Sequence, residues 1–268
     1  MARARPGEWT HQLFVQRPYL FLPFLEAGRA KGRSEAEDLA RLYREYGLRA
    51  GARILDLCCG IGRVAVPLAK LGYKVTGVDL APEYIKRARR YAKSKGVARK
   101  TKFIVGDYRD ISSALAAERP LDGILNTYTS MGYYGEEIDK RTFAELARHT
   151  AAGGIFILKT VNRDWLTKHF ERRGWDMVGD VLVLEERKLD AERSYMVNRW
   201  EYFRVVGANL KPEGVYTVDH RVYSPHELKD LMDSTGWKVR SMAADFRGTP
   251  IDVMSPERSE VVVIGGRR

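Results

Sequence analysis

Apolar and polar residues follow a repeating rhythm in the first two thirds of this chain. Short apolar runs alternate there with segments of helical spacing. The runs begin at Ile54, Val75, Phe103, Leu121 and Ile155, and helices are predicted between them, for example over residues 139–150. Short apolar runs that alternate with helices are typical of buried parallel strands in βαβ units. The pattern therefore predicts an α/β fold with a doubly wound, mostly parallel sheet.

The residues before the first run have a different pattern. Residues 8–30 mix five large aromatic side chains with Pro18 and Pro23, which excludes one long regular helix. Ser34–Tyr46 has apolar residues at helical spacing, with Ser34 as the predicted N-cap and Glu37 three residues later. The aromatic opening is either a lid over a ligand or simple packing, and packing is the more general expectation.

From Asn162 onward the pattern becomes extended. The segments Val181–Arg187, Tyr195–Val206 and Tyr216–Tyr223 are separated by predicted turns at residues 190–192 and 211–214. They predict an antiparallel sheet that is inserted after the fifth strand and covers a substrate pocket. A capped helix from Ser224 and two final strands, Trp237–Ala243 and Val261–Ile264, complete a seven-stranded sheet. The predicted organisation is 1–50 as cap and helix, 51–161 as cofactor-binding core, 162–223 as insertion and 224–268 as the end of the core.

A glycine turn after the first strand marks the candidate ligand site. Gly60 and Gly62 let the chain turn tightly and leave backbone bare for a ligand. Asp79 follows Gly60 by nineteen residues, near the spacing at which a carboxylate accepts both ribose hydroxyls of an adenosine-containing cofactor. The run Asp56–Arg63 lacks the third glycine that lets a dinucleotide's pyrophosphate approach, so the pattern departs from GxGxxG. A plain tight turn is the alternative interpretation.

The run Asp56–Arg63 resembles the motif of class I S-adenosylmethionine (SAM) methyltransferases, and the likeness extends over residues 50–161. The resemblance implies that SAM is bound and released as S-adenosylhomocysteine (SAH). It also implies that Asp107, after the third strand, accepts a hydrogen bond from the adenine amino group. The residues implied to bind the cofactor are Asp56, Cys58, Gly60, Gly62, Arg63, Asp79, Leu80, Asp107, Tyr108 and Asn126.

Candidates for catalysis follow the fourth and fifth strands, because polar strand ends of a parallel sheet face one crevice. Methyl transfer is an in-line displacement that depends chiefly on positioning. We expect Asn126, Tyr128 and Tyr133 to take part in it. Asn126-Thr127-Tyr128 partly resembles the Asp/Asn-Pro-Pro-Tyr motif of amino-directed nucleic-acid methyltransferases. Thr129–Tyr133 resembles a loop of small-molecule amine methyltransferases. Asp219 and His220 are possible bases, although a paired surface position is the stronger expectation for them.

Positive charge is concentrated in one segment of the chain. The net charge is +11, and residues 86–102 hold nine basic residues and no acid. Such density is typical of a surface that contacts phosphate backbones, while a solvated helix of a charge-rich protein is the alternative. The candidate substrate-binding residues are Lys86, Arg89, Arg90 and Lys93 from this segment, together with Asn162 and Arg163.

Composition also limits the other functions. The only cysteines are adjacent, and no HxxxH spacing occurs, so no metal site is expected. No apolar stretch is long enough to span a bilayer, and the basic start Met1–Pro6 is not followed by a signal-like segment, so a cytoplasmic protein is expected.

The leading prediction is N-methylation of an exocyclic base amine in RNA, such as cytidine N4. The alternatives are N-methylation of a small-molecule amine and a non-catalytic SAM-binding partner subunit. A pocket closed by the inserted sheet would favour the small molecule, whereas an open basic trough would favour RNA.

Overall fold

Two sheets organise the part of the chain that the computed structural model describes, residues 7–268. The basic start Met1–Pro6 lies outside the described residues. The larger sheet has the strand order β10-β11-β5-β4-β1-β2-β3, and β11 alone runs opposite to the other six strands. Its strands are β1 Arg53–Leu57, β2 Lys74–Asp79, β3 Thr101–Val105, β4 Leu121–Asn126, β5 Thr150–Val161, β10 Trp237–Ala243 and β11 Glu260–Arg267. This sheet confirms the predicted doubly wound fold.

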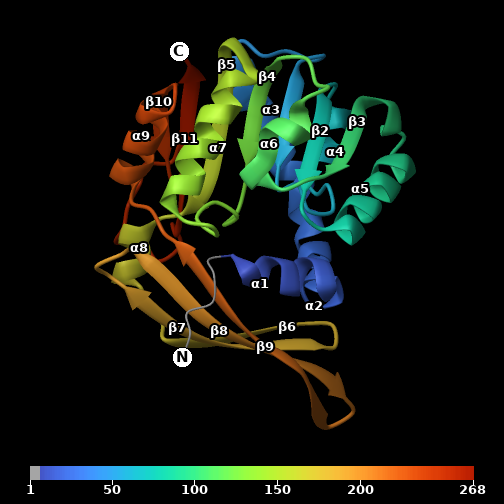
Figure 1. The fold of residues 1–268 in the computed structure, drawn as a ribbon, viewed down its shortest axis with the longest axis vertical. Helices are drawn as coiled ribbons and strands as arrows, with labels where there is room; N and C mark the ends of the chain where they lie inside the picture. Colours follow the sequence, from blue (N-terminus) through green and yellow to red (C-terminus); the bar gives the residue numbers. More distant parts are fainter. Residues whose placement is uncertain (1–6) are drawn as a thin grey trace.

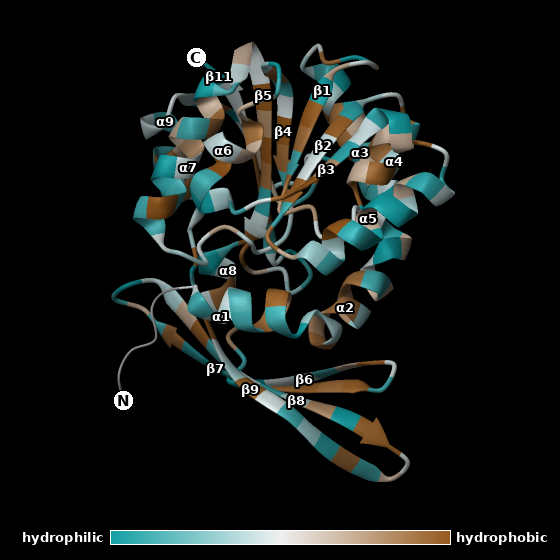
Figure 2. Cartoon of the chain, turned by 45° about the vertical axis from the view of Figure 1, so that its right-hand side comes forward, coloured by the Kyte–Doolittle hydropathy of each residue, from teal (hydrophilic) through white to brown (hydrophobic). Residues whose placement is uncertain are grey.

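Helices cover both faces of the larger sheet, and the two apolar layers between them and the strands form the core. One layer contains side chains of the helices α3, α4 and α5, and the other contains side chains of α6, α7 and α9. Figure 2 shows the apolar strands enclosed by helices whose outer faces are polar. The helix bounds are α3 Gly32–Glu45, α4 Ala65–Lys70, α5 Pro82–Ser94, α6 Ile111–Leu115, α7 Glu136–Arg148 and α9 Pro225–Ser234.

Strand β1 lies between β2 and β4, so the strand order reverses beside it. The crevice at such a switch point, beyond the carboxyl ends of the strands, is where open α/β sheets bind ligands. The fold therefore directs attention to the loops after β1, β2 and β4.

The inserted sheet has the order β6-β7-β8-β9, with every neighbouring pair antiparallel. Its strands are β6 Arg173–Val178, β7 Val181–Asp190, β8 Tyr195–Val206 and β9 Asn209–Arg221, and α8 Arg163–Lys168 precedes them. The predicted turn at residues 211–214 is wrong because β9 already begins at Asn209. Since β9 is an edge strand, it accepts Pro212 without losing a needed ladder hydrogen bond.

The N-terminal segment lies between the two sheets (Figure 1). It consists of α1 Glu8–Thr10, a π-helical turn His11–Gln16 and α2 Pro18–Ala27, and a 3-10 turn over residues 28–31 leads into α3. Helix α1 contacts β9, and α2 contacts both α5 and β6. The segment is broken at Arg17, as the prolines predicted, although Pro23 lies inside α2.

Three predicted element boundaries differ from the structure. Helix α3 begins at Gly32, because the preceding 3-10 turn continues directly into it, and the Ser34 hydroxyl donates to the Lys31 carbonyl. Strand β5 begins at Thr150, so residues 152–154 belong to a strand and do not end a helix. Helix α7 starts at Glu136, three residues earlier than expected, after Gly135 at φ 88°. The predicted cap of α9 is confirmed, because Ser224 and Glu227 form a capping box.

Among the helices of residues 7–268, none is both long and apolar enough to cross a membrane.

Candidate active site

A cavity of about 330 Å³ lies at the switch point, beneath the N-terminal segment. Its walls come from the loops after β1, β2 and β4, from α2 and from the π-helical turn. The residues that line it are Thr10, Phe14, Phe21, Phe24, Leu25, Gly28, Asp56, Cys58, Cys59, Gly60, Ile61, Arg63, Val64, Asp79, Leu80, Tyr84, Tyr108, Thr127, Tyr128, Thr129, Ser130, Tyr133 and Tyr134. Most of the residues that the sequence implied for cofactor binding are therefore in one wall.

The turn after β1 and the end of β2 are joined directly. The Gly60 N–H donates to Asp79 Oδ2 at 2.7 Å, and the Ala81 N–H donates to Asp79 Oδ1 at 3.0 Å. Gly60 has φ 51°, and a Cβ added there would extend into the cavity, with Leu25 as its nearest neighbour at 3.8 Å. Burial raises the pKa of Asp79 to about 6, although the two backbone hydrogen bonds oppose this shift. The spacing of these residues thus brings a carboxylate beside bare backbone.

Asp56 and Arg63 form the charged part of the wall. Burial raises the pKa of Asp56 to about 7, and Arg63 partly opposes the shift. The Arg63 guanidinium pairs with Glu35 and lies over the Tyr128 ring at 4.4 Å from its centroid. A buried guanidinium has donors left for the carboxylate of a ligand. Arg63 is therefore the cation that could hold the amino-acid end of a bound nucleoside derivative.

Three predicted cofactor residues lie beside the cavity and do not line it. A Cβ on Gly62 would be 3.2 Å from Ala88, so this glycine allows close packing against α5. Asp107 accepts from the Arg109 Nε at 2.8 Å, while its neighbour Tyr108 lines the cavity. Asn126 is fully buried and donates to the Leu57 carbonyl and the Ser130 hydroxyl, at 2.8 and 2.9 Å. Their cofactor roles, and the catalytic role of Asn126, stay predictions.

The loop after β4 supplies phenols to the opposite wall. Tyr133 Oη lies 3.4 Å from Thr129 Oγ1, and Tyr134 Oη lies 2.8 Å from Thr10 Oγ1. Burial raises the pKa of both phenols to about 12, so they are neutral at physiological pH. Tyr128 also lines the cavity and has φ 71°, which is unusual for a residue with a side chain. These residues offer hydroxyl groups and aromatic faces to an acceptor.

The N-terminal segment closes the cavity with aromatic rings. Phe14 contacts Phe21, Tyr84 and Tyr133, with ring centroids 5.3, 6.3 and 6.4 Å apart. All four rings line the cavity. From the sequence, a lid over a ligand was the weaker of two alternatives and packing the stronger. Aromatic residues near prolines do not indicate which ring faces a ligand.

Asn162 and Arg163 are not brought to the cavity. Asn162 is buried and caps α8 by accepting from the Asp164 N–H at 3.0 Å. Arg163 pairs with Glu227 at 2.9 Å, which joins the insertion to α9. Both residues hold the insertion in place, and their predicted contact with substrate has no support from this placement.

The basic residues of α5 also lie outside the cavity wall, on a helix at the β3 edge of the larger sheet (Figure 1). Lys86, Arg90 and Lys93 are exposed, and Arg89 donates to the Phe103 carbonyl at 2.6 Å. Residues 86–102 contain no acidic residue of their own. Glu83, just before this segment, pairs with both Lys86 and Arg87 and so neutralises part of its positive charge.

The surface position expected for His220 is wrong, because the residue is buried. It is 8% exposed, and burial lowers its pKa to about 4. Its ring lies edge-on to Tyr133, with centroids 5.9 Å apart. Sequence reasoning missed this burial because it depends on how the inserted sheet packs against the N-terminal segment.

In the part of the chain that the structure describes, no group of three or more His, Cys, Asp or Glu side chains could hold a metal ion.

Comparisons with known proteins agree with this geometry. Residues 54–154 match the family model described as a methyltransferase domain. The ubiquinone biosynthesis O-methyltransferase of Xanthomonas euvesicatoria pv. vesicatoria (strain 85-10) is 40% identical over 119 residues, which are 42% of this chain and 45% of that protein. The chain therefore matches less than half the length of this curated relative.

Two solved structures are similar over most of the chain. A SAM-dependent methyltransferase from Clostridium acetobutylicum ATCC 824 has a TM-score of 0.76 at 16% identity and covers 94% of this chain and 98% of its own. The sugar N-methyltransferase KedS8 from Streptoalloteichus sp ATCC 53650 has a TM-score of 0.68 at 20% identity, with 91% and 92% covered.

The sheet order and the cavity at the switch point are those of the class I methyltransferase fold. Within this fold, residues 54–154 form a methyltransferase domain. The cavity fits an adenosyl ligand: Gly60 leaves backbone exposed, Asp79 places a carboxylate beside it, and Arg63 supplies a cation.

Proposed function

We propose that this protein transfers the methyl group of SAM to the nitrogen of a small amine-bearing molecule. The observation that carries the proposal is the closure of the cavity by the N-terminal segment, which is itself held against the inserted sheet. The Trp9 Nε1 donates to the Asp219 carbonyl of β9 at 3.2 Å, and Arg17 donates to the Glu213 carbonyl. A site covered in this way suits a molecule of limited size.

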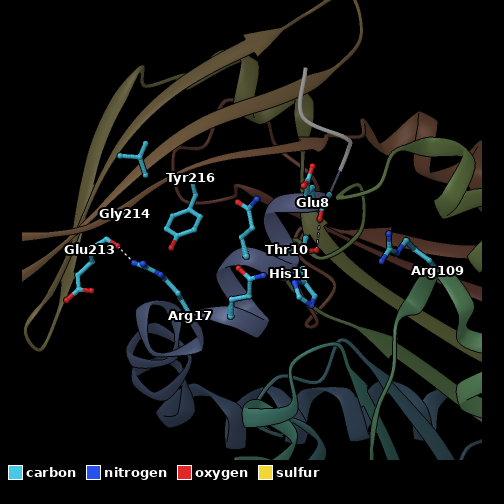
Figure 3. Close-up of a pocket in the computed structure, with 12 residues that line it drawn as sticks. Glu8, Thr10, His11, Arg17, Arg109, Glu213, Gly214 and Tyr216 are labelled. Carbon is cyan, nitrogen blue, oxygen red and sulfur yellow. Dashed lines mark hydrogen bonds between the residues drawn. The ribbon is translucent and has the colours of Figure 1, made fainter. Parts of the chain in front are cut away.

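An outer groove of about 510 Å³ lies on the other side of the π-helical turn (Figure 3). Thr10 lines both the groove and the cavity, and the charged groups of the groove are Glu8, Arg17, Arg109 and Glu213. Figure 3 shows Arg17 reaching toward Glu213 across this groove. The N-terminal segment therefore separates a polar outer surface from the aromatic interior.

On the donor side, Asp79 would accept from the ribose hydroxyls and Arg63 would hold the carboxylate of SAM. When bound, SAM supplies an electrophilic methyl group on its sulfonium. The chain holds the acceptor in line with that group through the walls of the cavity, which also exclude water.

On the acceptor side, the described lining residues offer carboxyl groups only at Asp56 and Asp79, both in the donor wall. The phenols of Tyr133 and Tyr134 are neutral and cannot serve as strong bases. Burial among aromatic rings disfavours a charged ammonium and lowers the pKa of a bound amine. We therefore infer that the amine releases its proton to water before or during entry, and that the cavity receives it in the nucleophilic, neutral form.

RNA was the leading prediction from the sequence, and the geometry gives it less support than the small amine. The basic residues of α5 do not line the cavity, and the cavity is covered by aromatic residues. The similarity to the sugar N-methyltransferase extends over 91% of this chain, including the parts outside the matched domain, and this favours a small acceptor.

Methyl transfer from SAM labelled in its methyl group tests the proposal, with a small-molecule extract and total RNA offered separately. We expect label in the small-molecule fraction and none that nuclease treatment releases. The combined variant Lys86→Ala, Arg90→Ala and Lys93→Ala serves as the matched control, since it removes exposed charge from residues that do not line the cavity. Unchanged labelling of the small fraction by this variant fits the proposal. If the protein labels RNA and this variant does not, the proposal is overturned. If the protein binds SAM but transfers label to neither fraction, the proposal is also overturned, in favour of a partner subunit.

A further inference from the structure

The inner face of the inserted sheet carries three polar atoms that are buried without a hydrogen-bond partner in the described part of the chain. They are Asn198 Oδ1, Trp200 Nε1 and His220 Nδ1, here called the polar trio. Asn198 and His220 are 7% and 8% exposed. Because buried polar groups are nearly always paired in native proteins, three such atoms on one face require an explanation.

The strand register places the polar trio together. Asn198 and Trp200 are two residues apart on β8 and therefore point to the same face. His220 of β9 is directly opposite Met196, the next residue of that face, so it is a diagonal neighbour of Asn198. The same face packs its apolar residues Val218 and Tyr202 against the N-terminal segment.

Each ring of the polar trio contacts an aromatic residue of the cavity wall. The Trp200 ring is parallel to that of Phe21, with an interplanar angle of 8° and centroids 6.1 Å apart. The His220 ring lies edge-on to Tyr133. Phe21 and Tyr133 both line the cavity, so the rings of Trp200 and His220 are one side-chain layer behind it, and Asn198 lies beside them on the same face of the sheet.

We propose that the polar trio recognises hydroxyl groups of the methyl acceptor, so that the acceptor class is a hydroxylated amine. This inference rests on the proposed function. The indole N–H can only donate, and the amide oxygen can only accept, so together they match a hydroxyl group, which does both. Neutral His220 can complete the set as donor or acceptor. The amine itself would remain at the donor wall, while small shifts of Phe21 and Tyr133 admit the hydroxylated edge.

Two amines that differ by one hydroxyl group test the inference: trans-2-aminocyclohexanol and cyclohexylamine. Their affinities for the SAH-loaded protein are measured by calorimetry. We expect the hydroxylated amine to bind about tenfold more tightly, because a site built to hydrogen-bond a hydroxyl group discriminates against the analogue that lacks it. In Trp200→Phe, which keeps an aromatic ring of smaller size but removes the N–H, and in Asn198→Leu, the two affinities should become nearly equal.

Trp175→Phe is the matched control, because Trp175 is 69% exposed on β6 of the same sheet. This variant should keep the full preference. Equal affinities for the two amines, binding of neither, or a preference that survives both Trp200→Phe and Asn198→Leu would overturn the inference. The inference would also be overturned if these variants changed the Tm but kept the preference for the hydroxylated amine. That result would mean that the polar trio binds a buried structural water.

The same samples distinguish this inference from the proposed function. Methyl transfer to both amines without discrimination would contradict only the role of the polar trio. A preference for the hydroxylated amine that depends on Trp200, without methyl transfer to either amine, would contradict only the proposed function.

Discussion

At the scale of single residues, two carboxyl groups of the cavity wall titrate well above their ordinary range. Burial raises the pKa of Asp79 to about 6 and that of Asp56 to about 7. A carboxyl group with a raised pKa in the folded state keeps its proton there while the unfolded chain loses it. The stability that this proton provides is therefore lost as the pH rises from about 4 through 6 and 7.

We predict that SAH binds more tightly as the pH rises from 5 to 8, because ribose hydroxyl groups donate best to ionised Asp79. Calorimetric titrations at several pH values measure this change. Asp79→Asn keeps the shape of the side chain, and we expect about tenfold weaker binding with a shallower dependence on pH. An affinity that falls as the pH rises would contradict the assigned role of Asp79.

Gly62 gives a prediction about stability. It has φ 75°, and a Cβ there would lie 3.2 Å from both Ala88 and Phe103. We expect Gly62→Ala to lower the free energy of unfolding by about 2–4 kcal/mol, through backbone strain and overpacking. Gly96→Ala is the control, since Gly96 has φ 72° but open space around it, and about 1 kcal/mol is expected. Urea-induced unfolding measures both, and equal losses would exclude the packing role.

The sequence predicted residues whose positions depend on local geometry. Gly60 and Asp79 are joined by one βαβ unit, so their spacing alone brings them together. The direction of the Asn126 amide depends on Ser130 and on the end of β1, which no local pattern reports. The burial of His220 depends on the register of two strands and on a segment that is 200 residues away in the chain.

At the scale of elements, the N-terminal segment both packs its aromatic rings together and lines the cavity. Phe14 is its central ring, because it touches Trp9, Phe21, Tyr84 and Tyr133. Packing is therefore shown for this side chain, and a role as a lid over a ligand stays a prediction.

We predict that Phe14→Ala raises the KM for the acceptor severalfold and lowers the free energy of unfolding by about 2 kcal/mol, since the ring is half-buried. Steady-state kinetics and urea-induced unfolding measure these effects. Tyr19→Ala on the exposed side of α2 should change neither by much. A loss of stability with an unchanged KM would show that the segment only packs.

The elements that the sequence predicted wrongly contain proline and glycine residues. Whether such a residue ends a helix or a strand depends on the elements packed around it. Pro23 lies within α2, and Pro212 lies within β9, where an edge position makes it acceptable. Residues 152–154 include two glycines that normally end helices, yet they lie within β5, where its register with β4 shifts. Strand β6 was missed, because its apolar Trp175 and Met177 are exposed while Asp176 lies opposite the buried Val183, so its apolar residues do not mark a buried face.

At the scale of the whole molecule, Arg221 connects the inserted sheet to the larger domain. Its side chain is buried and pairs with Glu227 of α9 and Glu136 of α7. The Arg221 N–H also donates to the Gly132 carbonyl at 2.9 Å, in the loop that carries the phenols.

We predict that Arg221→Ala lowers the free energy of unfolding by about 2 kcal/mol, because it removes a buried side chain together with its ion pairs to the partly exposed Glu136 and Glu227. Arg173→Ala is the control, since this exposed arginine pairs with Glu186 at the surface and should contribute less than about 1 kcal/mol. Urea-induced unfolding compares the two variants. Similar effects would contradict the connecting role of Arg221.

The contact between α1 and β9 has a consequence for biosynthesis. Trp9 and the strand residue that accepts its indole hydrogen bond, Asp219, are 210 residues apart. At translation rates of about 5–20 residues per second, the aromatic rings of the first turns leave the ribosome roughly 10–40 s before that strand does. During this interval the surface that the inserted sheet provides for them is missing, so part of their apolar area stays exposed on the nascent chain and is a target for chaperone binding.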